Sequence, residues 1–551
     1  MAQDLPSLCL SRILAFHSDD LSTLYSCTLV NRDWCRFAVP LLWKRPFSFL
    51  HQYTPEILSI RLIDVYCAGF SSNERIYINN LLGYLEDKIP SNSIFNYVTF
   101  LRELDVLQAS FCITRWACFT HVDFMIQTLP FINIFLQHFV KNSPKITHLI
   151  FTINNIYGSI SWYDINLNLL IGKNAKDCFE QLKVLDCTGD FNPKLLSICS
   201  MISKRIEKIR ISLYKISLYK HLKQPSIEMT NLQNLRSLIQ TQQNLKHLII
   251  ENVKSGGLGE QGVLGILELT DEIHRSLEKL IFRYVEFYNN DIILSIRNLQ
   301  KLGTLKFENC NLSNHPLKFS EWIRDKVVFV GGVGGVDIEG DMRGLSNLTN
   351  LSVYGSKVPI SLLTFMTLQA NDGLTVLDMR AKEIKAHEVN DLLQVISQNC
   401  KHLVEFSTHM IPNHDLLPLL LPTLTSNPRL EKLVIDTGTG VNTSENVDAF
   451  LPRFGKHLPP SLRGLEILMV WSFHHESLDK FFQESRANLE TLKLKFCDCI
   501  EDDHVDIILK HSKNHLKLLN IKGTTNITYE TWNKLQQDKQ LHVEFHSDME
   551  K

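Results

Sequence analysis

The 551-residue sequence lacks several features that would assign it to a common functional class. Its charges nearly cancel, with 57 Lys and Arg against 59 Asp and Glu, so overall charge favours neither nucleic acid nor a membrane surface as a partner. Polar residues and a proline interrupt its most apolar window, 124–140, so no membrane-spanning helix is expected. The N-terminus has no basic stretch followed by an apolar one, which argues against a secretory signal. We therefore expect a protein of the cytoplasm, the nucleus or both.

Cysteine pairs at metal-site spacing are also missing. The 13 cysteines are an odd number spread along the chain, and no C-x-x-C motif occurs. The one close pair, Cys497 and Cys499, has no further ligands at zinc-site spacing. This distribution is typical of reduced thiols rather than a disulfide framework. The sequence predicts no metal and no cofactor.

The sequence contains no enzyme signature. The glycine cluster at 331–335 is not a P-loop, because no Gly-Lys-Ser or Gly-Lys-Thr follows it, and not a dinucleotide fingerprint, because its sixth position after the first glycine is Asp337. His474-His475-Glu476 lacks H-E-x-x-H spacing and is interpreted as surface or core polar residues. No G-x-S-x-G elbow occurs. We expect a protein that is not an enzyme; the alternative of an enzyme built around the glycine cluster would require nucleotide binding.

The segment from Leu5 to Phe47 predicts three short amphipathic helices. Their start signals are Leu5-Pro6-Ser7, Asp19-Asp20 and Asn31. Apolar residues follow these signals at helical spacing, namely Leu10, Ile13 and Leu14, then Leu21, Leu24 and Cys27, then Trp34, Phe37, Ala38, Leu41 and Leu42, with Pro40 expected to kink or end the third helix. About 45 residues is near the lower limit for an independently stable core. We therefore expect this module to need a partner.

This segment resembles the F-box, the motif that binds a Skp-family adaptor of cullin-RING ubiquitin ligases. The matching residues are Leu5-Pro6, Ile13-Leu14, Leu29-Val30-Asn31-Arg32 followed by Trp34, and Leu42-Trp43. The resemblance implies an apolar interface with the adaptor. The candidates for adaptor contact or support are Leu5, Pro6, Leu10, Ile13, Leu14, Leu24, Leu29, Val30 and Trp34. Some of them are expected to hold the three helices together instead.

The phrase L-x-x-L-x-L, with Ile, Val or Phe replacing Leu, recurs through the rest of the chain. From Leu348 the clear phrases begin 26, 56, 32, 27 and 27 residues apart, and a weaker phrase at Leu403 divides the 56 into 29 and 27. This period matches leucine-rich repeats, in which each unit supplies a short strand and a return segment. The phrases begin at Leu245, Leu277, Leu302, Leu348, Leu374, Leu430, Leu462, Leu489 and Leu516, with weaker ones at Ile146, Leu182, Ile206 and Leu403.

Two further patterns support this interpretation. The segments 388–397 and 504–511 have helical spacing and suit return helices. Two phrases end on a cysteine, Cys310 and Cys497, at the turn where a small polar group satisfies buried backbone. The gap from Leu302 to Leu348 is 46 residues, about 20 more than one repeat, so we expect a Gly-rich insertion or a degenerate repeat near 323–344.

The repeats resemble the cysteine-containing leucine-rich repeats found behind F-boxes, most closely over 489–511. The resemblance implies an α/β fold: an F-box at 1–47, a helical connector at 48–145 and a leucine-rich-repeat solenoid at 146–551, a horseshoe with parallel strands on its concave face and helices on its convex face. Within the connector, helical periodicity is visible in 56–67 and in 96–107. The connector is expected to hold the F-box rigidly against the first repeats.

Side chains that alternate with the inward leucines are expected to line the concave face. A basic subset would suit an acidic or phosphorylated target, although Glu251, Glu308, Asp378, Asp436 and Glu466 occupy equivalent positions. The candidate substrate-binding residues are Lys279, Arg283, Lys306, Lys432, Lys493, Lys495 and Lys522.

The two resemblances together predict a non-catalytic substrate-recognition subunit of an SCF-type ubiquitin ligase. Its partners would be a Skp-family adaptor, through it a cullin-RING ligase, and a protein target that the sequence does not identify. The alternative is a repeat scaffold whose F-box-like helices only cap the solenoid, since repeat arrays need terminal caps. Binding to the adaptor separates the two hypotheses.

Overall fold

The computed structural model describes the chain in segments. These are residues 6–49, 55–83, 93–120, 128–151, 173–188, 194–212, 225–253, 271–287, 296, 298–312, 345–382, 386–409, 417–436, 444–497, 499–512, 515–521, 527–537 and 541–544. Leu5, Lys522 and the glycine-rich stretch predicted near 323–344 lie outside them. The chain forms two compact units, Met1–Ile273 and His274–Lys551, and each is treated separately.

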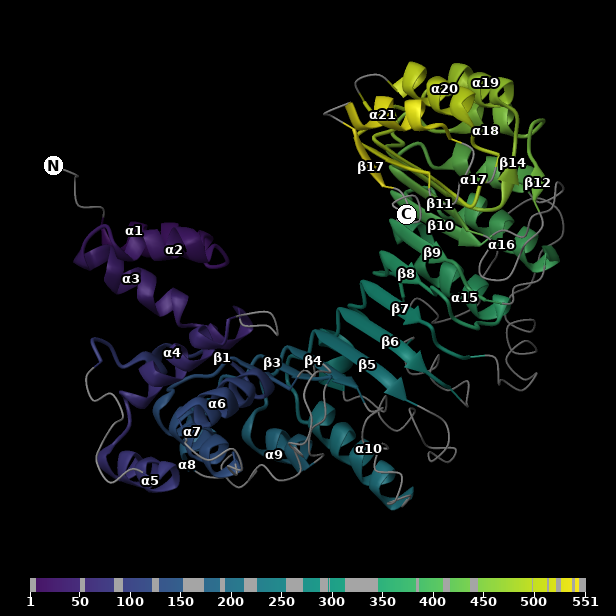
Figure 1. The fold of residues 1–551 in the computed structure, drawn as a ribbon. Coiled ribbons are helices and arrows are strands. Elements are labelled where there is room, and N and C mark those ends of the chain that lie inside the picture. Colours follow the sequence, from purple (N-terminus) through teal and green to yellow (C-terminus); the bar gives the residue numbers. More distant parts are fainter. Residues whose placement is uncertain are drawn as a thin grey trace. The chain divides into compact units, whose positions relative to one another are not determined.

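The first unit begins with the three predicted helices, which we call the N-terminal module. They are α1 (Ser7–Phe16), α2 (Leu21–Thr28) and α3 (Arg32–Leu42) (Figure 1). The side chain of Asp20 accepts a hydrogen bond from the Thr23 main-chain N–H at 3.0 Å, and Asn31 accepts one from Trp34 at 2.9 Å, so both predicted caps form. Pro40 lies inside α3, which ends two residues later. The helices pack around Leu10, Leu14, Leu24, Cys27 and Ala38, with Trp34, Phe37, Leu41 and Leu42 partly buried against them.

A helical connector follows the module. It contains α4 (Glu56–Cys67), α5 (Ser72–Leu82), α6 (Val106–Thr120) and α7 (Leu129–Asn142). An aromatic cluster joins it to the end of the module: Phe47 stacks on Tyr66 at 5.9 Å, and Tyr66 meets Phe139 edge to face at 4.9 Å. Trp116 also donates a hydrogen bond from Nε1 to Asp64 at 2.8 Å. These contacts fasten α4, α6 and α7 to the segment that leaves α3.

The helix predicted over 96–107 is wrong. This segment holds a short 3-10 turn, η2 (Tyr97–Phe100), and then strand β1 (Glu103–Asp105), which pairs in parallel with β2 (His148–Ile150). Leu101, Leu104 and Val106 are buried, and their spacing repeats the L-x-x-L-x-L phrase, with Leu101 two residues before β1. The sheet therefore starts at β1, well before the solenoid boundary predicted at residue 146.

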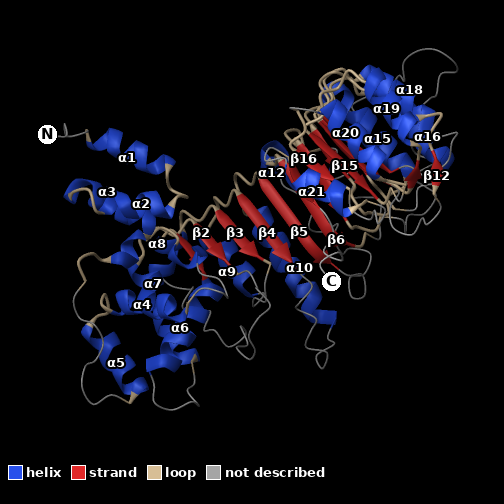
Figure 2. Ribbon diagram, turned by 45° about the horizontal axis from the view of Figure 1, so that its top comes forward, coloured by secondary structure: helices blue, strands red, loops and turns tan. Residues whose placement is uncertain are grey.

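The remaining strands of the first unit continue the sheet in chain order. They are β3 (Val184–Cys187), β4 (Lys208–Ser212) and β5 (His247–Val253), and each pairs in parallel with the strand before it. Return helices α8 (Lys173–Phe179), α9 (Lys194–Ile202) and α10 (Pro225–Gln240) lie between them in the chain, and α9 and α10 lie beside β3 to β5 in Figure 2. This parallel order is that of a leucine-rich-repeat solenoid.

The second unit repeats this order over a longer run of parallel strands. The strands of its main sheet are β6 (Lys279–Val285), β7 (Thr304–Glu308), β8 (Asn350–Ser352), β9 (Val376–Met379), β10 (Glu405–His409), β11 (Lys432–Asp436), β13 (Gly464–Leu468), β15 (Thr491–Lys495), β16 (Leu518–Asn520) and β17 (His542–Glu544). A small second sheet pairs β12 (Glu445–Asn446) with β14 (Trp471–Ser472).

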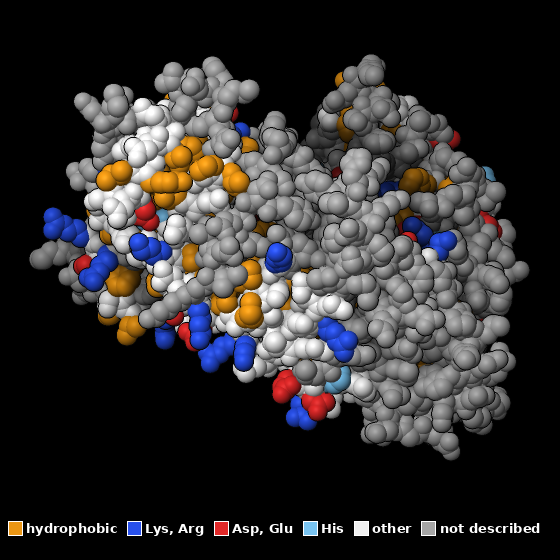
Figure 3. Space-filling model, turned by 90° about the horizontal axis from the view of Figure 1, so that it is seen from below, with side chains coloured by type: hydrophobic (Ala, Val, Ile, Leu, Met, Phe, Trp, Pro, Cys, Tyr) orange, Lys and Arg blue, Asp and Glu red, His pale blue; other side chains and the backbone are white. Residues whose placement is uncertain are grey.

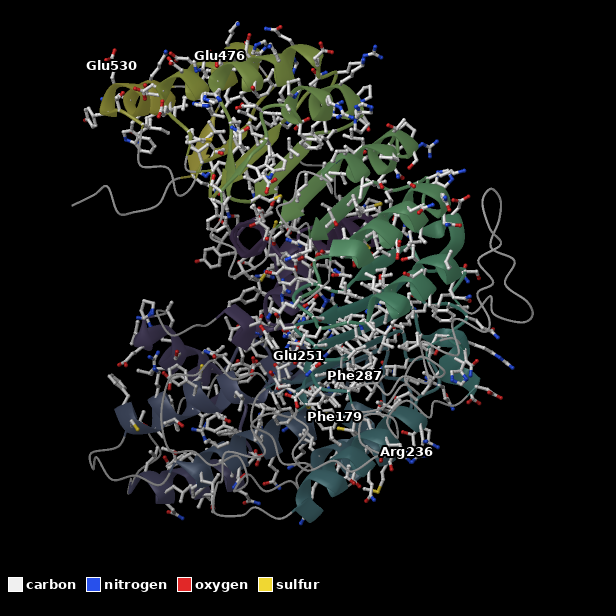
Figure 4. All side chains as sticks on the ribbon, turned by 90° about the vertical axis from the view of Figure 1, so that its right-hand side faces the viewer. Phe179, Arg236, Glu251, Phe287, Glu476 and Glu530 are labelled. Carbon is white, nitrogen blue, oxygen red and sulfur yellow. The ribbon has the colours of Figure 1, made fainter. Side chains whose placement is uncertain are left out.

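The return helices of the second unit are α15 (Ile360–Ala370), α16 (Ala386–Asn399), α17 (Leu420–Ser426), α18 (Leu451–His457), α19 (His475–Glu484), α20 (Asp502–Ser512) and α21 (Tyr529–Gln537). Helices α16 and α20 contain the segments 388–397 and 504–511 that the sequence predicted as helical. Glu476 and Glu530 extend from the outer side of this helical layer (Figure 4).

Every predicted repeat phrase marks a strand. Each anchor residue, including the weaker ones at Ile146, Leu182, Ile206 and Leu403, is buried and stands two residues before a strand. The predicted turn cysteines are buried as well: the Cys310 thiol donates to the Phe282 carbonyl at 3.4 Å, and the Cys497 thiol donates to the Met469 carbonyl at 3.6 Å. None of the 13 cysteines forms a disulfide. Burial raises the pKa of the Cys310 thiol to about 12, so it stays protonated and able to donate.

Buried amide side chains link successive repeats. Asn427, which is fully buried after α17, accepts a hydrogen bond at Oδ1 from the Leu403 main-chain N–H at 2.9 Å and donates from Nδ2 to the Thr423 carbonyl at 2.9 Å. In the first unit, Gln242 after α10 likewise accepts a hydrogen bond at Oε1 from the main-chain N–H of the anchor Ile206 at 2.9 Å. Each amide therefore satisfies the main-chain donor of a preceding anchor, which would otherwise be buried without a partner.

Helices α18 and α19 approach each other most closely at Gly455. A Cβ atom at this position would overlap the carbonyl oxygen of Phe481. We therefore expect Gly455→Ala to lower the free energy of unfolding of the second unit by about 2 kcal/mol, through overpacking. Gly464→Ala is the control, because the nearest atom to its added Cβ is Lys432 Cγ at an ordinary 3.6 Å. Urea denaturation measures both; equal stability of the two variants would contradict the close approach.

Candidate protein-binding surfaces

The structure divides the candidate adaptor-binding residues into two groups. Leu10, Leu14 and Leu24 are buried in the core of the N-terminal module, so they hold its helices together. Trp34 is partly buried against the same core. The remaining described candidates are exposed, namely Pro6, Ile13, Leu29 and Val30. Ile13 shares the apolar stripe of α1 with Leu10 and Leu14, but it is 41% exposed because the small module covers one side of α1 only in part.

The exposed apolar side chains of the module form what we call the module surface: Leu8, Ile13, Phe16, Tyr25, Leu29 and Val30. Leu29 is 72% and Val30 58% exposed, and both stand between α2 and α3. Sequence reasoning missed Leu8, Phe16 and Tyr25, because they lie off the apolar stripe that the helical spacing identified. So many exposed apolar side chains on so small a module are typical of a protein interface.

The N-terminal module lies away from the end of the first unit's sheet (Figure 1). Helices α1 and α2 make their main contacts with α3. The sheet edge is met instead by the segment after α3: the Lys44 carbonyl accepts hydrogen bonds from the main-chain N–H groups of Arg102 and Glu103 at 2.9 and 3.0 Å. Residues after α3, rather than helices α1 to α3, therefore provide the hydrogen-bond partner at the edge of the first strand, β1.

A second set of exposed apolar side chains belongs to the connector. It consists of Ile57 and Leu58 on α4, Ile76 and Tyr77 on α5, and Phe119 on α6. Hydrophobic side chains also gather in patches on the underside of the first unit (Figure 3). We assign no function to this set, and its adjacent pair Ile76 and Tyr77 provides a control for the module surface.

The candidate substrate-binding residues lie on the strands. Lys279 and Arg283 are on β6, Lys306 on β7, Lys432 on β11, and Lys493 and Lys495 on β15. They are only partly buried and alternate with core residues, so they belong to the strand face that points away from the core.

Ion pairs neutralise several of these cations. Arg283 Nε lies 2.6 Å from Glu308, and Glu466 lies between Lys432 at 3.3 Å and Lys493 at 3.4 Å. In the first unit, Arg210 on β4 likewise lies 3.1 Å from Glu251 and 3.6 Å from Asp186. Within the part of the chain that the structure describes, no ion pair involves Lys279, Lys306 or Lys495. The strand face is therefore mixed in charge rather than uniformly basic.

The predicted polar cluster at His474 fastens a loop of the second unit. The Asp448 carboxylate accepts hydrogen bonds from His474, from the main-chain N–H at 2.7 Å and from Nδ1 at 2.5 Å. The hydrogen bond with Asp448 raises the pKa of His474. Burial by itself would raise the pKa of Asp448, but the hydrogen bonds from His474 outweigh it and hold the pKa at about 2. No group of His, Cys, Asp and Glu suited to a metal ion exists among the described residues.

This pair predicts a pH dependence of the second unit. Because folding raises the pKa of His474, the protonated pair stabilises the fold below the ordinary histidine pKa, and this contribution is lost as pH rises through the folded value. Thermal unfolding should therefore show the wild type losing more stability than His474→Gln between about pH 6 and pH 9. Parallel curves for the two proteins would contradict the ion pair. On the acid side, the contribution of Asp448 is lost only below pH 4, as pH falls toward about 2.

Comparison with known proteins identifies no family for this chain. No family model and no curated protein matches it. Similar solved structures include the Rad7 and Elc1 complex in yeast, at 13% identity over 60% of this chain and 87% of that chain, with a TM-score of 0.28. The leucine-rich-repeat protein LegL7 from Legionella pneumophila is 13% identical over 69% of this chain and 94% of that chain, with a TM-score of 0.27. A leucine-rich-repeat protein from Bacteroides eggerthii is 10% identical over 90% of this chain and 80% of that chain, with a TM-score of 0.26. TM-scores this low carry no argument, so the fold assignment rests on strand order and register.

Within the described ranges, no helix has both the length and the apolar character needed to cross a bilayer.

Proposed function

We propose that this chain is a non-catalytic target-binding subunit of an SCF-type ubiquitin ligase. The N-terminal module would bind a Skp-family adaptor, which connects it to a cullin-RING ligase, and the strand face of the repeats would bind the protein to be ubiquitinated. The proposal combines the F-box resemblance with one structural observation: the module surface exposes Leu29, Val30 and further apolar side chains on helices that lie away from the sheet.

The division of roles within the module follows from burial. The exposed residues Pro6, Ile13, Leu29 and Val30 are the proposed adaptor contacts, and Leu8, Phe16 and Tyr25 are added to them. The buried leucines and Trp34 are proposed to shape the surface from beneath. Burial of exposed apolar area supplies the main free energy of such an interface.

A receptor of this kind works without chemistry of its own. It holds its target at a high effective concentration near the ubiquitin-loaded enzyme that the ligase carries. The aromatic cluster of Phe47, Tyr66 and Phe139 supports this role, because it fixes the segment that follows the module to the connector of the same unit. We propose that the chain acts in the cytoplasm, the nucleus or both, where such ligases act.

The alternative is a repeat scaffold whose first helices only cap the solenoid. The hydrogen bonds from β1 to the Lys44 carbonyl favour the segment after α3 as the cap, which leaves α1 and α2 without a capping role. Co-expression with a Skp-family adaptor, followed by size-exclusion chromatography with light scattering, tests the proposal. We expect a one-to-one complex; a chain that is folded and monomeric beside the free adaptor would overturn it.

A further inference from the structure

One backbone position is distinctive in the repeats. The eighth residue of the phrase, counted from its first leucine, adopts the left-handed conformation in several of the described repeats: Asn252 at φ 57°, Tyr284 at 53°, Asn309 at 54°, Gly355 at 64° and Phe496 at 70°. Asparagine and glycine suit this conformation. A bulky aromatic residue does not, so Tyr284 and Phe496 are held there under strain.

Packing does not account for either aromatic residue. Tyr284 and Phe496 are each 56% exposed, whereas Phe282 and Val285, on either side of Tyr284, are fully buried. An asparagine at these positions would satisfy the backbone equally well, as Asn309 does in the next repeat after Tyr284. A strained, exposed aromatic side chain that the fold does not need indicates a functional contact.

Two lysines precede Tyr284 along the same pair of strands. Lys306 on β7 stands opposite Ile281 of β6, and Lys279 and Arg283 lie two residues to either side of Ile281 on the same strand face. Arg283 is bound to Glu308, but no ion pair holds Lys279 or Lys306 among the described residues. Ile281 is only 3% exposed beneath these side chains. Tyr284 therefore stands at the end of a strand pair whose face carries two lysines over an apolar floor, and Lys279 lies about 16 Å from it along β6.

The next repeat also carries an exposed aromatic ring beside a cation. Tyr354, which follows β8, is 44% exposed and lies 4.6 Å beneath the guanidinium of Arg380, whose charge is bound by Asp378 at 2.7 Å. Farther along the sheet the balance reverses, since Glu405, Asp436 and Glu466 lie on the strand face of β10 to β13 together with Lys432. Positive charge and exposed aromatic rings thus coincide at β6 to β8.

We propose that Tyr284, Lys279 and Lys306 form the binding site for an anionic linear segment of the target protein, in which an apolar side chain stands to one side of acidic groups. The lysines would pair with the acidic groups, and the apolar side chain would lie against the Tyr284 ring. The inference rests on the proposed function in that the partner is the protein that the receptor holds, but the binding itself needs no adaptor. Both carboxylates and phosphates supply the anionic chemistry.

Fluorescence anisotropy with the full chain tests the site. The probes are three labelled synthetic peptides that share one leucine and carry on one side of it glutamates, phosphoserines or, as the neutral control, glutamines. We expect the glutamate peptide to bind, the glutamine peptide to bind at least about tenfold more weakly, and affinity to fall with added salt. Binding of the phosphoserine peptide alone would identify phosphate as the required anion. Equal affinity for all three peptides, or no binding by any, would overturn the proposal.

Two variants and a matched control locate the site. Tyr284→Asn should lower affinity about tenfold while thermal stability stays equal or rises, because asparagine relieves the strain; a purely structural tyrosine would give the opposite stability result. Lys279→Gln with Lys306→Gln should lower both affinity and salt dependence. Lys534→Gln is the control, because Lys534 lies on return helix α21 of the same unit rather than on a strand and is paired with Asp506. Unchanged binding by Tyr284→Asn, or equal loss with the control, would refute the site.

The same samples separate this inference from the proposed function. A chain that binds the glutamate peptide but no adaptor keeps the site and rejects the ligase role. A chain that binds the adaptor but none of the peptides rejects the site and keeps the ligase role.

Discussion

Replacement of Leu29 and Val30 by aspartate is expected to abolish the complex with a Skp-family adaptor while the chain stays folded. Both side chains are exposed, so charge at these positions costs the free chain little. In the complex they would be desolvated, and each anchor that is lost typically weakens binding by about 2 kcal/mol or more. If the two losses add, affinity falls roughly a thousandfold. Isothermal titration of the full chain with the adaptor measures this change.

The connector provides a matched control for this experiment. Ile76 and Tyr77 are also adjacent, apolar and exposed, at 59% and 47%, but they belong to α5. Ile76→Asp with Tyr77→Asp should leave adaptor affinity within about twofold of the wild type, with unchanged circular dichroism for both double variants. Equal losses of affinity for the two double variants would mean that non-specific hydrophobic association, rather than the module surface, binds the adaptor.

Asn427→Leu is expected to cause the largest loss of stability by a single substitution in the second unit. The leucine has a similar volume but satisfies neither the Leu403 N–H nor the Thr423 carbonyl that Asn427 binds. A buried donor left without a partner costs about 1–3 kcal/mol, so the free energy of unfolding should fall by roughly 3 kcal/mol in total. Because a repeat contacts only its neighbours, β10 and β11 should open first.

Urea denaturation and hydrogen exchange measure this effect. Asn488→Leu is the control, because Asn488 is exposed and water replaces its hydrogen bonds. Asn427→Asp should lose less stability than Asn427→Leu, since it retains an oxygen that accepts from Leu403. Equal stabilities of the two leucine variants would show that the amide does not link the repeats.

The repeat phrase predicted most of the fold because it records burial directly. Its first leucine must face the core, so even the weak anchors Ile146 and Leu403 located strands correctly. It failed at Leu101, where a strand of three residues followed at once by α6 produces an apolar pattern that resembles one continuous helix. Local periodicity does not separate these two structures, because parallel pairing with β2 decides between them.

The candidate surfaces were less predictable than the fold. Helical spacing put Leu10, Ile13 and Leu14 on one apolar stripe but did not separate the buried leucines from the exposed Ile13, because the tertiary packing of a small module decides how far its stripe is covered. Hydrophobic patterning could not predict the left-handed conformation of Tyr284, because it carries no information on φ. The eighth position of the phrase could have identified it, since Asn252 and Asn309 hold equivalent positions.

Hydrogen exchange of the full chain with and without the adaptor tests the central claim most directly. The account predicts protection of amides in α1, α2 and α3 on binding, with unchanged exchange in β1 and the later strands of the first unit. Faster exchange in β1 on binding would show that the helices cap the sheet and must be displaced. Unchanged exchange in α1 to α3 at saturating adaptor would contradict a docking role for the module.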